Sequence, residues 1–126
     1  MIRTEIQFMA DIYEEIVSIQ KVTLNIDYNT FVSDAIKLKA VKYSLIIIGE
    51  ASNKLSKETL AKYSQVNWKE IISLRNRIVH EYFGLKVRLL WDIISQELEK
   101  LKEVVITMIK SEYPEDAIAV FKYYDK

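Results

Sequence analysis

The stretch VRLLWDIISQELEKLKEVVITM, residues 87–108, decides the fold class of this chain. Its apolar residues recur at alternating spacings of four and three: Val87, Trp91, Ile94, Leu98, Leu101, Val105 and Met108. This rhythm matches the 3.6-residue turn of an α-helix and places one apolar seam along its length. We therefore predict one long amphipathic helix here, which needs other helices to cover its seam.

The same spacing recurs twice earlier in the chain. It selects Ile2, Ile6, Met9, Tyr13 and Ile16 near the start, and Leu38, Val41, Leu45, Ile48, Ser52 and Leu55 in the middle. Ile46 and Ile47 widen the middle stripe, which indicates a helix at the centre of the fold or in contact with another subunit. Two glycines and one proline among 126 residues leave few places for tight turns, so the helices should be long.

Local signals mark where helices begin and end. Asn67 followed by Glu70 predicts the start of a helix over 68–80, and Ser56 predicts a short helix to about residue 63. Gly84 is a candidate C-terminal cap for the first of these helices. The stretch 23–29 is expected to be a loop, and Pro114 should end the long last helix. We predict an all-α bundle of four to five main helices over residues 1–112, with a tail at 113–126.

Composition excludes several classes of protein. The chain has no cysteine, which removes disulfides, thiolate catalysis and cysteine-bound metals. Acidic residues interrupt the N-terminus where a signal peptide needs an apolar core, and no apolar run reaches the ~18 residues of a membrane span. A cytoplasmic location without membrane contact is the expectation. The formal net charge is zero, but residues 68–88 carry five cations against two acids.

The stretch Leu74–Phe83 concentrates the chemistry. His80 is the only histidine, and an unperturbed imidazole exchanges protons near pH ~6.5. Beside it, Arg75 offers forked hydrogen bonds to phosphate oxygens, which is the pairing that metal-independent RNA cleavage needs. On an ideal helix, Arg75 and His80 are ~140° apart, whereas Asn76 shares a face with His80. Fraying near Gly84 would be needed to bring His80 and Tyr82 towards Arg75.

A structural interpretation of the same residues stays open. Histidine and arginine near a helix C-terminus are favoured by the helix dipole alone, by about 0.3–1 kcal/mol. On spacing, Tyr82 and Phe83 are expected in the core, and Glu50 is expected either to pair with an arginine or to be solvated. The aromatic residues of the tail are expected to dock on the bundle rather than to stack on RNA bases.

Several segments together resemble a known family. Arg75, His80 and Tyr82 match the Arg-x4-His-x-Tyr signature of HEPN-domain toxins of the HepT-like family, the partners of minimal nucleotidyltransferase (MNT) antitoxins. The segment 47–55, IIGEASNKL, is similar to another stretch of that family, as are 68–72 and 83–84 with Trp91. The resemblance covers roughly residues 2–110, and the joint pattern is more specific than the arginine–histidine pair alone.

The resemblance implies an HEPN-type bundle, usually a homodimer, in a type VII (HEPN/MNT) toxin–antitoxin system. The activity implied is endoribonuclease cleavage through attack of the RNA 2′-hydroxyl, with no metal or other cofactor. Arg75 and His80 would be catalytic, with Asn76 as the polar residue beside them. Tyr82 would be the hydroxyl that the nucleotidyltransferase adenylylates to silence the toxin.

Two features keep a second class of function open. Glu81 lies where the family often has a small residue, so it places an acid between His80 and Tyr82. The overall neutral charge also gives no broad attraction to nucleic acid. The alternative is a non-catalytic HEPN module that binds nucleotide or the nucleotidyltransferase partner.

Overall fold

The computed structural model describes residues 3–124, and within that range the chain forms helices and no strands. The elements are α1 (Glu5–Val22), α2 (Tyr28–Ser33), α3 (Ala35–Asn53), α4 (Lys57–Lys62), α5 (Trp68–His80), α6 (Val87–Gln96), α7 (Leu98–Glu112) and α8 (Pro114–Tyr124). The all-α prediction is confirmed, and α1, α3, α5 and α7 are the main helices. None of the helices in this range is both long and apolar enough to cross a membrane.

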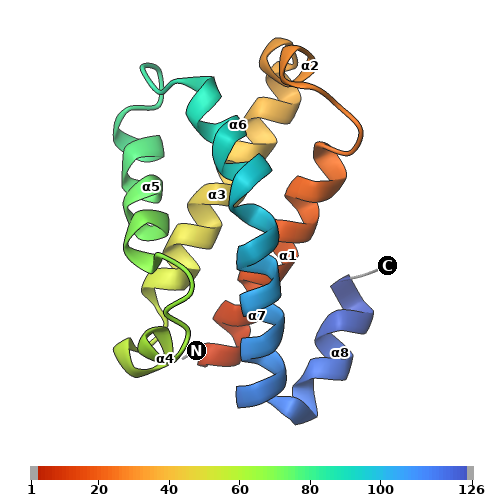
Figure 1. The fold of residues 1–126 in the computed structure, drawn as a ribbon, viewed down its shortest axis with the longest axis vertical. Coiled ribbons are helices and arrows are strands. Elements are labelled where there is room, and N and C mark those ends of the chain that lie inside the picture. Colours follow the sequence, from red (N-terminus) through yellow and green to blue (C-terminus); the bar gives the residue numbers. More distant parts are fainter. Residues whose placement is uncertain (1–2, 125–126) are drawn as a thin grey trace.

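Helix α3 lies at the centre of the bundle, which is one of the two positions that its wide apolar stripe predicted. It packs against α1 on one side and α5 on the other, while α7 packs against α1 (Figure 1). Val41, Leu45 and Ile48 are buried along α3, and the flanking Ile46 and Ile47 are half-buried. The N-terminal stripe also points inward, with Met9, Tyr13 and Ile16 buried and Ile6 partly so; Ile2 lies outside the described residues. This arrangement fixes α5 against the centre of the fold along one face.

The predicted long helix over 87–108 is interrupted at Glu97, between α6 and α7. The Glu97 N–H donates to the Ile93 carbonyl at 2.9 Å, and the Glu97 carbonyl accepts from the Leu101 N–H at 3.1 Å. The two segments follow one another in Figure 1. The apolar spacing of three and four continues unchanged across the break, so the pattern alone contained no sign of it.

The predicted loop over 23–29 was wrong at its end, because α2 begins at Tyr28. The Asp27 carboxylate caps α2 by accepting a hydrogen bond from the Thr30 N–H at 2.8 Å. Phe31 is fully buried, with its ring 5.2 Å from that of Trp91. A six-residue helix is too short for its apolar residues to repeat, which is why the spacing did not reveal it.

The tail forms a helix of its own. Pro114 follows the end of α7 and is the first residue of α8, a position that suits proline because no hydrogen bond from its nitrogen is needed. Helix α8 packs on α7 and α1, and the Phe121 ring lies 4.9 Å from that of Tyr13. The expectation that the tail aromatics dock on the bundle is therefore confirmed for Phe121.

Candidate active site

Helix α5 carries most of the candidate residues, and its start is as predicted. The Asn67 side chain accepts a hydrogen bond from the Glu70 N–H at 3.2 Å. Trp68 is buried and its indole N–H donates to the Tyr63 carbonyl at 2.9 Å. Leu74 and Ile78 are buried further along the helix. Because these residues face the bundle, the positions between them are directed towards the outer surface.

Arg75 is oriented by two polar neighbours. Its Nε lies 2.5 Å from Oε1 of Glu50 on α3, and its NH1 group donates to the Asn76 side-chain oxygen at 2.8 Å. The Nε itself is buried and makes no aligned hydrogen bond, so the contact with Glu50 is a charge pair. About a third of the Arg75 side chain remains exposed, at 32%. The guanidinium is therefore held at the surface and not sealed inside the bundle.

Gly49 allows α3 and α5 to approach closely at this point. A Cβ atom added to Gly49 would collide with the Arg75 Cβ and would lie 3.1 Å from the Ile71 carbonyl oxygen. At the observed spacing of α3 and α5, position 49 therefore has room only for a residue without a side chain. The Gly49-Glu50 pair thus sets both the spacing of the helices and the partner of the arginine.

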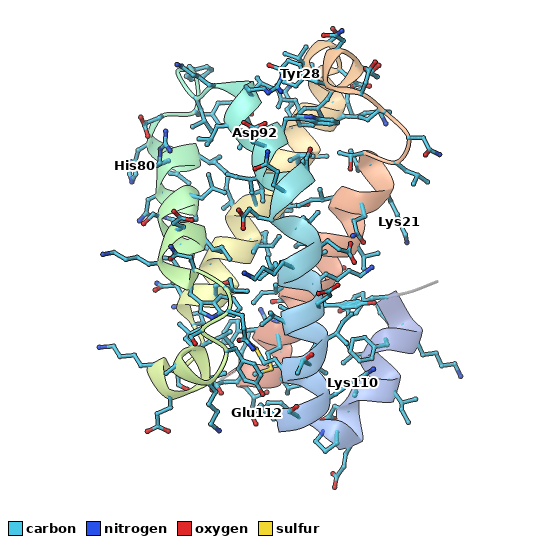
Figure 2. All side chains as sticks on the ribbon, in the orientation of Figure 1. Lys21, Tyr28, His80, Asp92, Lys110 and Glu112 are labelled. Carbon is cyan, nitrogen blue, oxygen red and sulfur yellow. The ribbon has the colours of Figure 1, made fainter. Side chains whose placement is uncertain are left out.

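His80 is the last residue of α5 and is exposed to solvent. Figure 2 shows it at the outer edge of the bundle. Within the described part of the chain it has no hydrogen-bond or ion-pair partner. The helix is continuous to His80, so the fraying that would bring His80 towards Arg75 is not found. Within a single chain, Arg75 and His80 remain on different sides of α5.

Tyr82 lies in a tight turn directly after α5. The Gly84 N–H donates to the Glu81 carbonyl at 2.9 Å, which closes the turn over 81–84. Lys42 of α3 lies beneath Tyr82, with its Nζ 4.1 Å from the ring centroid and 3.5 Å from the Tyr82 carbonyl oxygen. Gly84 is the fourth residue of this turn and does not have a positive φ. The prediction that it caps α5 was wrong, because Glu81 has that position.

The charges around the site are partly paired with one another. The Arg77 Nε donates to Oε2 of Glu81 at 3.2 Å, so the acid that distinguishes this motif is directed to a cation on the preceding helical turn. Lys42 is 8% exposed and has no carboxylate partner among the described residues. Its ammonium is therefore a positive charge close to Tyr82 that no acid offsets.

An exposed apolar surface continues from the Glu50–Arg75 pair. Ile36, Tyr43 and Glu50 are spaced seven apart on α3 and so share one face. Ile36 is 82% and Tyr43 62% exposed, and Val79, four residues after Arg75 on α5, is 42% exposed. The groove of about 510 Å³ beside α5 and the hollow beside α2 do not include Arg75 or His80. With His80 exposed and Arg75 partly exposed, the candidate site lies on an open face of the single chain.

Two residues beside the site were missed or misplaced by sequence reasoning. Lys42 was not selected, although its position four residues after Leu38 places it beside the apolar stripe of α3, which is a signal that could have indicated it. Phe83 was expected in the core with Tyr82, yet it is 99% exposed at the turn, while Tyr82 is partly buried. Spacing could not distinguish these cases because the turn after His80 ends the helical periodicity.

Comparison with known proteins gives the family. The family described as "Ribonuclease HepT-like" matches residues 12–108, most of the chain. The chain belongs to this family. Its relatives include a candidate RNase of Methanocaldococcus jannaschii, 39% identical over 98 residues that cover 78% of this chain and 90% of the relative. A candidate ribonuclease HepT of Thermococcus cleftensis is 32% identical over 102 residues, covering 81% and 93%.

A third relative from another organism fits the same family. It is a candidate RNase of Caldanaerobacter subterraneus subsp. tengcongensis, 40% identical over 87 residues that cover 69% of this chain and 78% of the relative. No solved structure matches the chain significantly. Membership of the HepT-like family and the names of these relatives support ribonuclease activity.

Proposed function

We propose that this HepT-like protein is the toxin of a toxin–antitoxin pair and an endoribonuclease that needs no metal ion. The observation that carries the proposal is the partly exposed Arg75, which Glu50 and Asn76 hold in place. Arg75 lies on the same helix as the exposed His80. A fixed guanidinium and a solvent-accessible imidazole are the two groups that such cleavage uses. Because its substrate is cellular RNA, we assign the protein to the cytoplasm.

The proposed reaction uses the RNA itself as the source of the nucleophile. The ribose 2′-hydroxyl attacks the adjacent phosphorus as His80 removes its proton, and the bond to the 5′-oxygen of the next nucleotide breaks. The departing oxygen takes a proton from a second, protonated imidazole, and the other product carries a 2′,3′-cyclic phosphate. Arg75 stabilises the additional negative charge on the phosphate oxygens in the transition state, and Asn76 keeps the guanidinium in position.

We also propose that the active form is a homodimer. One imidazole cannot readily act as both base and acid in a single turnover, and a two-fold pair supplies two copies of His80. The exposed face with Ile36, Tyr43 and Val79 supports this proposal, because it adjoins Arg75 and leaves three large apolar side chains open to solvent. Such exposed apolar patches are typical of protein interfaces. A second copy on this face would convert the open site into a cleft.

The proposed partner is an MNT-type nucleotidyltransferase that silences the toxin. The Tyr82 hydroxyl attacks the α-phosphorus of ATP, pyrophosphate leaves, and the tyrosine keeps an AMP group. That group adds a bulky negative charge two residues from His80, where it would repel RNA. Mass spectrometry of the co-expressed chain should find AMP on Tyr82, and the Tyr82→Phe variant should remain unmodified.

The ribonuclease proposal is tested with two substitutions at exposed or partly exposed positions. His80→Ala and Arg75→Ala should each lower RNA cleavage by at least about a hundredfold and relieve growth arrest in cells. Circular dichroism should show an unchanged helical content, which separates loss of chemistry from loss of fold. Full cleavage by either variant in a nuclease-free preparation would contradict the proposal. Binding of nucleotide or partner without any turnover by the native chain would favour the non-catalytic alternative.

A further inference from the structure

We propose that Phe83 is the stacking platform for an unpaired base of the RNA, next to the phosphodiester that is cleaved. The inference rests on the proposed ribonuclease function and narrows its substrate. A ring can stack only on a base that is not enclosed in a duplex, so the substrate class is single-stranded or looped RNA.

Phe83 is the most exposed large hydrophobic side chain in the described part of the protein, at 99%. Burying a phenylalanine is worth about 1.5–3 kcal/mol, and this ring gains none of it within the single chain. Phe31 and Phe121 are docked against Trp91 and Tyr13, and the exposed tyrosines Tyr43 and Tyr123 are only 62% and 65% exposed. The near-complete exposure of Phe83 therefore exceeds that of these other described aromatics.

The turn holds the Phe83 ring in a defined place. Phe83 is the third residue of the turn closed by the 2.9 Å hydrogen bond from Gly84 to Glu81. Its ring meets that of Tyr82 edge-on, with centroids 5.4 Å apart, and Lys42 supports Tyr82 from beneath. An edge-on contact uses at most one face of the Phe83 ring. At least one π face is left open to a flat ligand.

The surroundings of Phe83 favour a nucleobase over the apolar surface of another protein. The exposed positions that flank it in the chain include the charged Glu81 and Lys86. Lys86 is exposed, and the Lys42 ammonium beneath Tyr82 adds a positive charge that no described carboxylate offsets. His80 is three residues away across the same turn. An aromatic ring beside cations is the pattern with which proteins bind single strands without sequence preference.

The test measures binding without cleavage. A fluorescently labelled single-stranded 2′-O-methyl RNA, which lacks the free hydroxyl that the proposed reaction needs, is titrated with the native chain and with Phe83→Ala. We expect Phe83→Ala to weaken binding about tenfold and Phe83→Trp to retain it within about twofold. Tyr123→Ala, which removes an exposed aromatic from α8, is the matched control and should bind as the native chain does. Replacing one base at a time by an abasic residue should weaken native binding at one position and have no further effect in Phe83→Ala.

The outcomes separate this inference from the ribonuclease proposal. If the native chain binds the RNA and Phe83→Ala binds it equally well, the stacking role is overturned and the ribonuclease proposal remains. Loss of binding together with a changed subunit number in sedimentation would also overturn stacking, because Phe83 would then be covered by a second copy. If the native chain does not bind this RNA but cleaves the all-ribose form, stacking is overturned and the ribonuclease proposal remains, whereas neither binding nor cleavage would overturn both.

Discussion

At the scale of single residues, the Glu50 carboxylate determines where the Arg75 guanidinium is directed. Glu50→Gln keeps the size of the side chain but removes the charge that holds Arg75. The released guanidinium would attract phosphate more strongly but would be less well placed in the transition state. We expect KM for RNA to fall and kcat to fall by about tenfold or more, because small displacements of a catalytic group are costly. Steady-state kinetics on a short RNA measures both quantities, and an unchanged kcat would remove Glu50 from the site.

A second residue-scale prediction concerns stability and pH, away from the site. Burial raises the pKa of Glu15, and the hydrogen bond that it accepts from the Ser44 hydroxyl at 2.8 Å only partly opposes this shift. The folded state therefore binds the proton more readily than the unfolded chain, so the cost of the charged form is present at neutral pH and disappears as pH falls. Glu15→Gln, which can still accept from Ser44, should be more stable than the native chain at pH 7.

That advantage of Glu15→Gln should shrink as the pH falls towards about 4, where the unfolded glutamate also becomes protonated. Urea unfolding at several pH values measures the difference in the free energy of unfolding. A constant difference across this range would show that Glu15 is not destabilised by its charge.

At the scale of elements, the contact between α3 and α5 depends on Gly49. In Gly49→Ala the new methyl group meets the Arg75 Cβ, which cannot move without α5. We expect a loss of about 1–3 kcal/mol in the free energy of unfolding and weaker RNA cleavage, because Arg75 moves away from its partners. The matched control is Gly84→Ala, whose new Cβ would have its nearest contact at 4.0 Å, with the Glu81 carbonyl oxygen. Equal stability of the two variants in urea would contradict this role of Gly49.

The elements that the sequence predicted are those whose apolar faces repeat over several turns or whose first residue is a clear cap. Helices α1 and α3 follow from their spacing, whereas α4 and α5 follow from their caps Ser56 and Asn67, each of which accepts its expected backbone hydrogen bond. The break at Glu97 and the short α2 were not predictable in this way, because the first leaves the apolar spacing intact and the second has no repeat. The exposure of Phe83 depends on how the turn after α5 leaves the bundle, which is decided by tertiary packing.

At the scale of the whole molecule, the open face beside Arg75 leads to a prediction about assembly. Tyr43→Arg places a charge on the exposed apolar face of α3 and should separate the proposed dimer into single chains of 14.8 kDa. Cleavage should then fall by at least about a hundredfold, because the second His80 is lost. Ile118→Arg is the control, since Ile118 is also strongly exposed, at 78%, but belongs to α8, which lies on the opposite side of the bundle from α5 (Figure 1). Sedimentation measures the mass, and full activity of a monomeric Tyr43→Arg chain would contradict the shared site.

The candidate site was only partly predictable from the chain. The motif selected Arg75, Asn76, His80 and Tyr82, and Glu50 was expected to pair with an arginine or to be solvated. The partner of Glu50 and the position of Lys42 beneath Tyr82 required the packing of α3 on α5. The regular helix keeps Arg75 and His80 apart within the single chain, so their proposed joint action depends on a second copy.

The most direct test of the central claim replaces one ribose in the substrate. Once the cleavage site in a short RNA is mapped, the nucleotide on its 5′ side is changed to its 2′-deoxy form, which removes the proposed nucleophile and little else. The account predicts that the native chain cleaves the all-ribose RNA to a product with a 2′,3′-cyclic phosphate and no longer cleaves the substituted RNA at that position. Cleavage of the deoxy-substituted RNA at the same bond and at the same rate would contradict it.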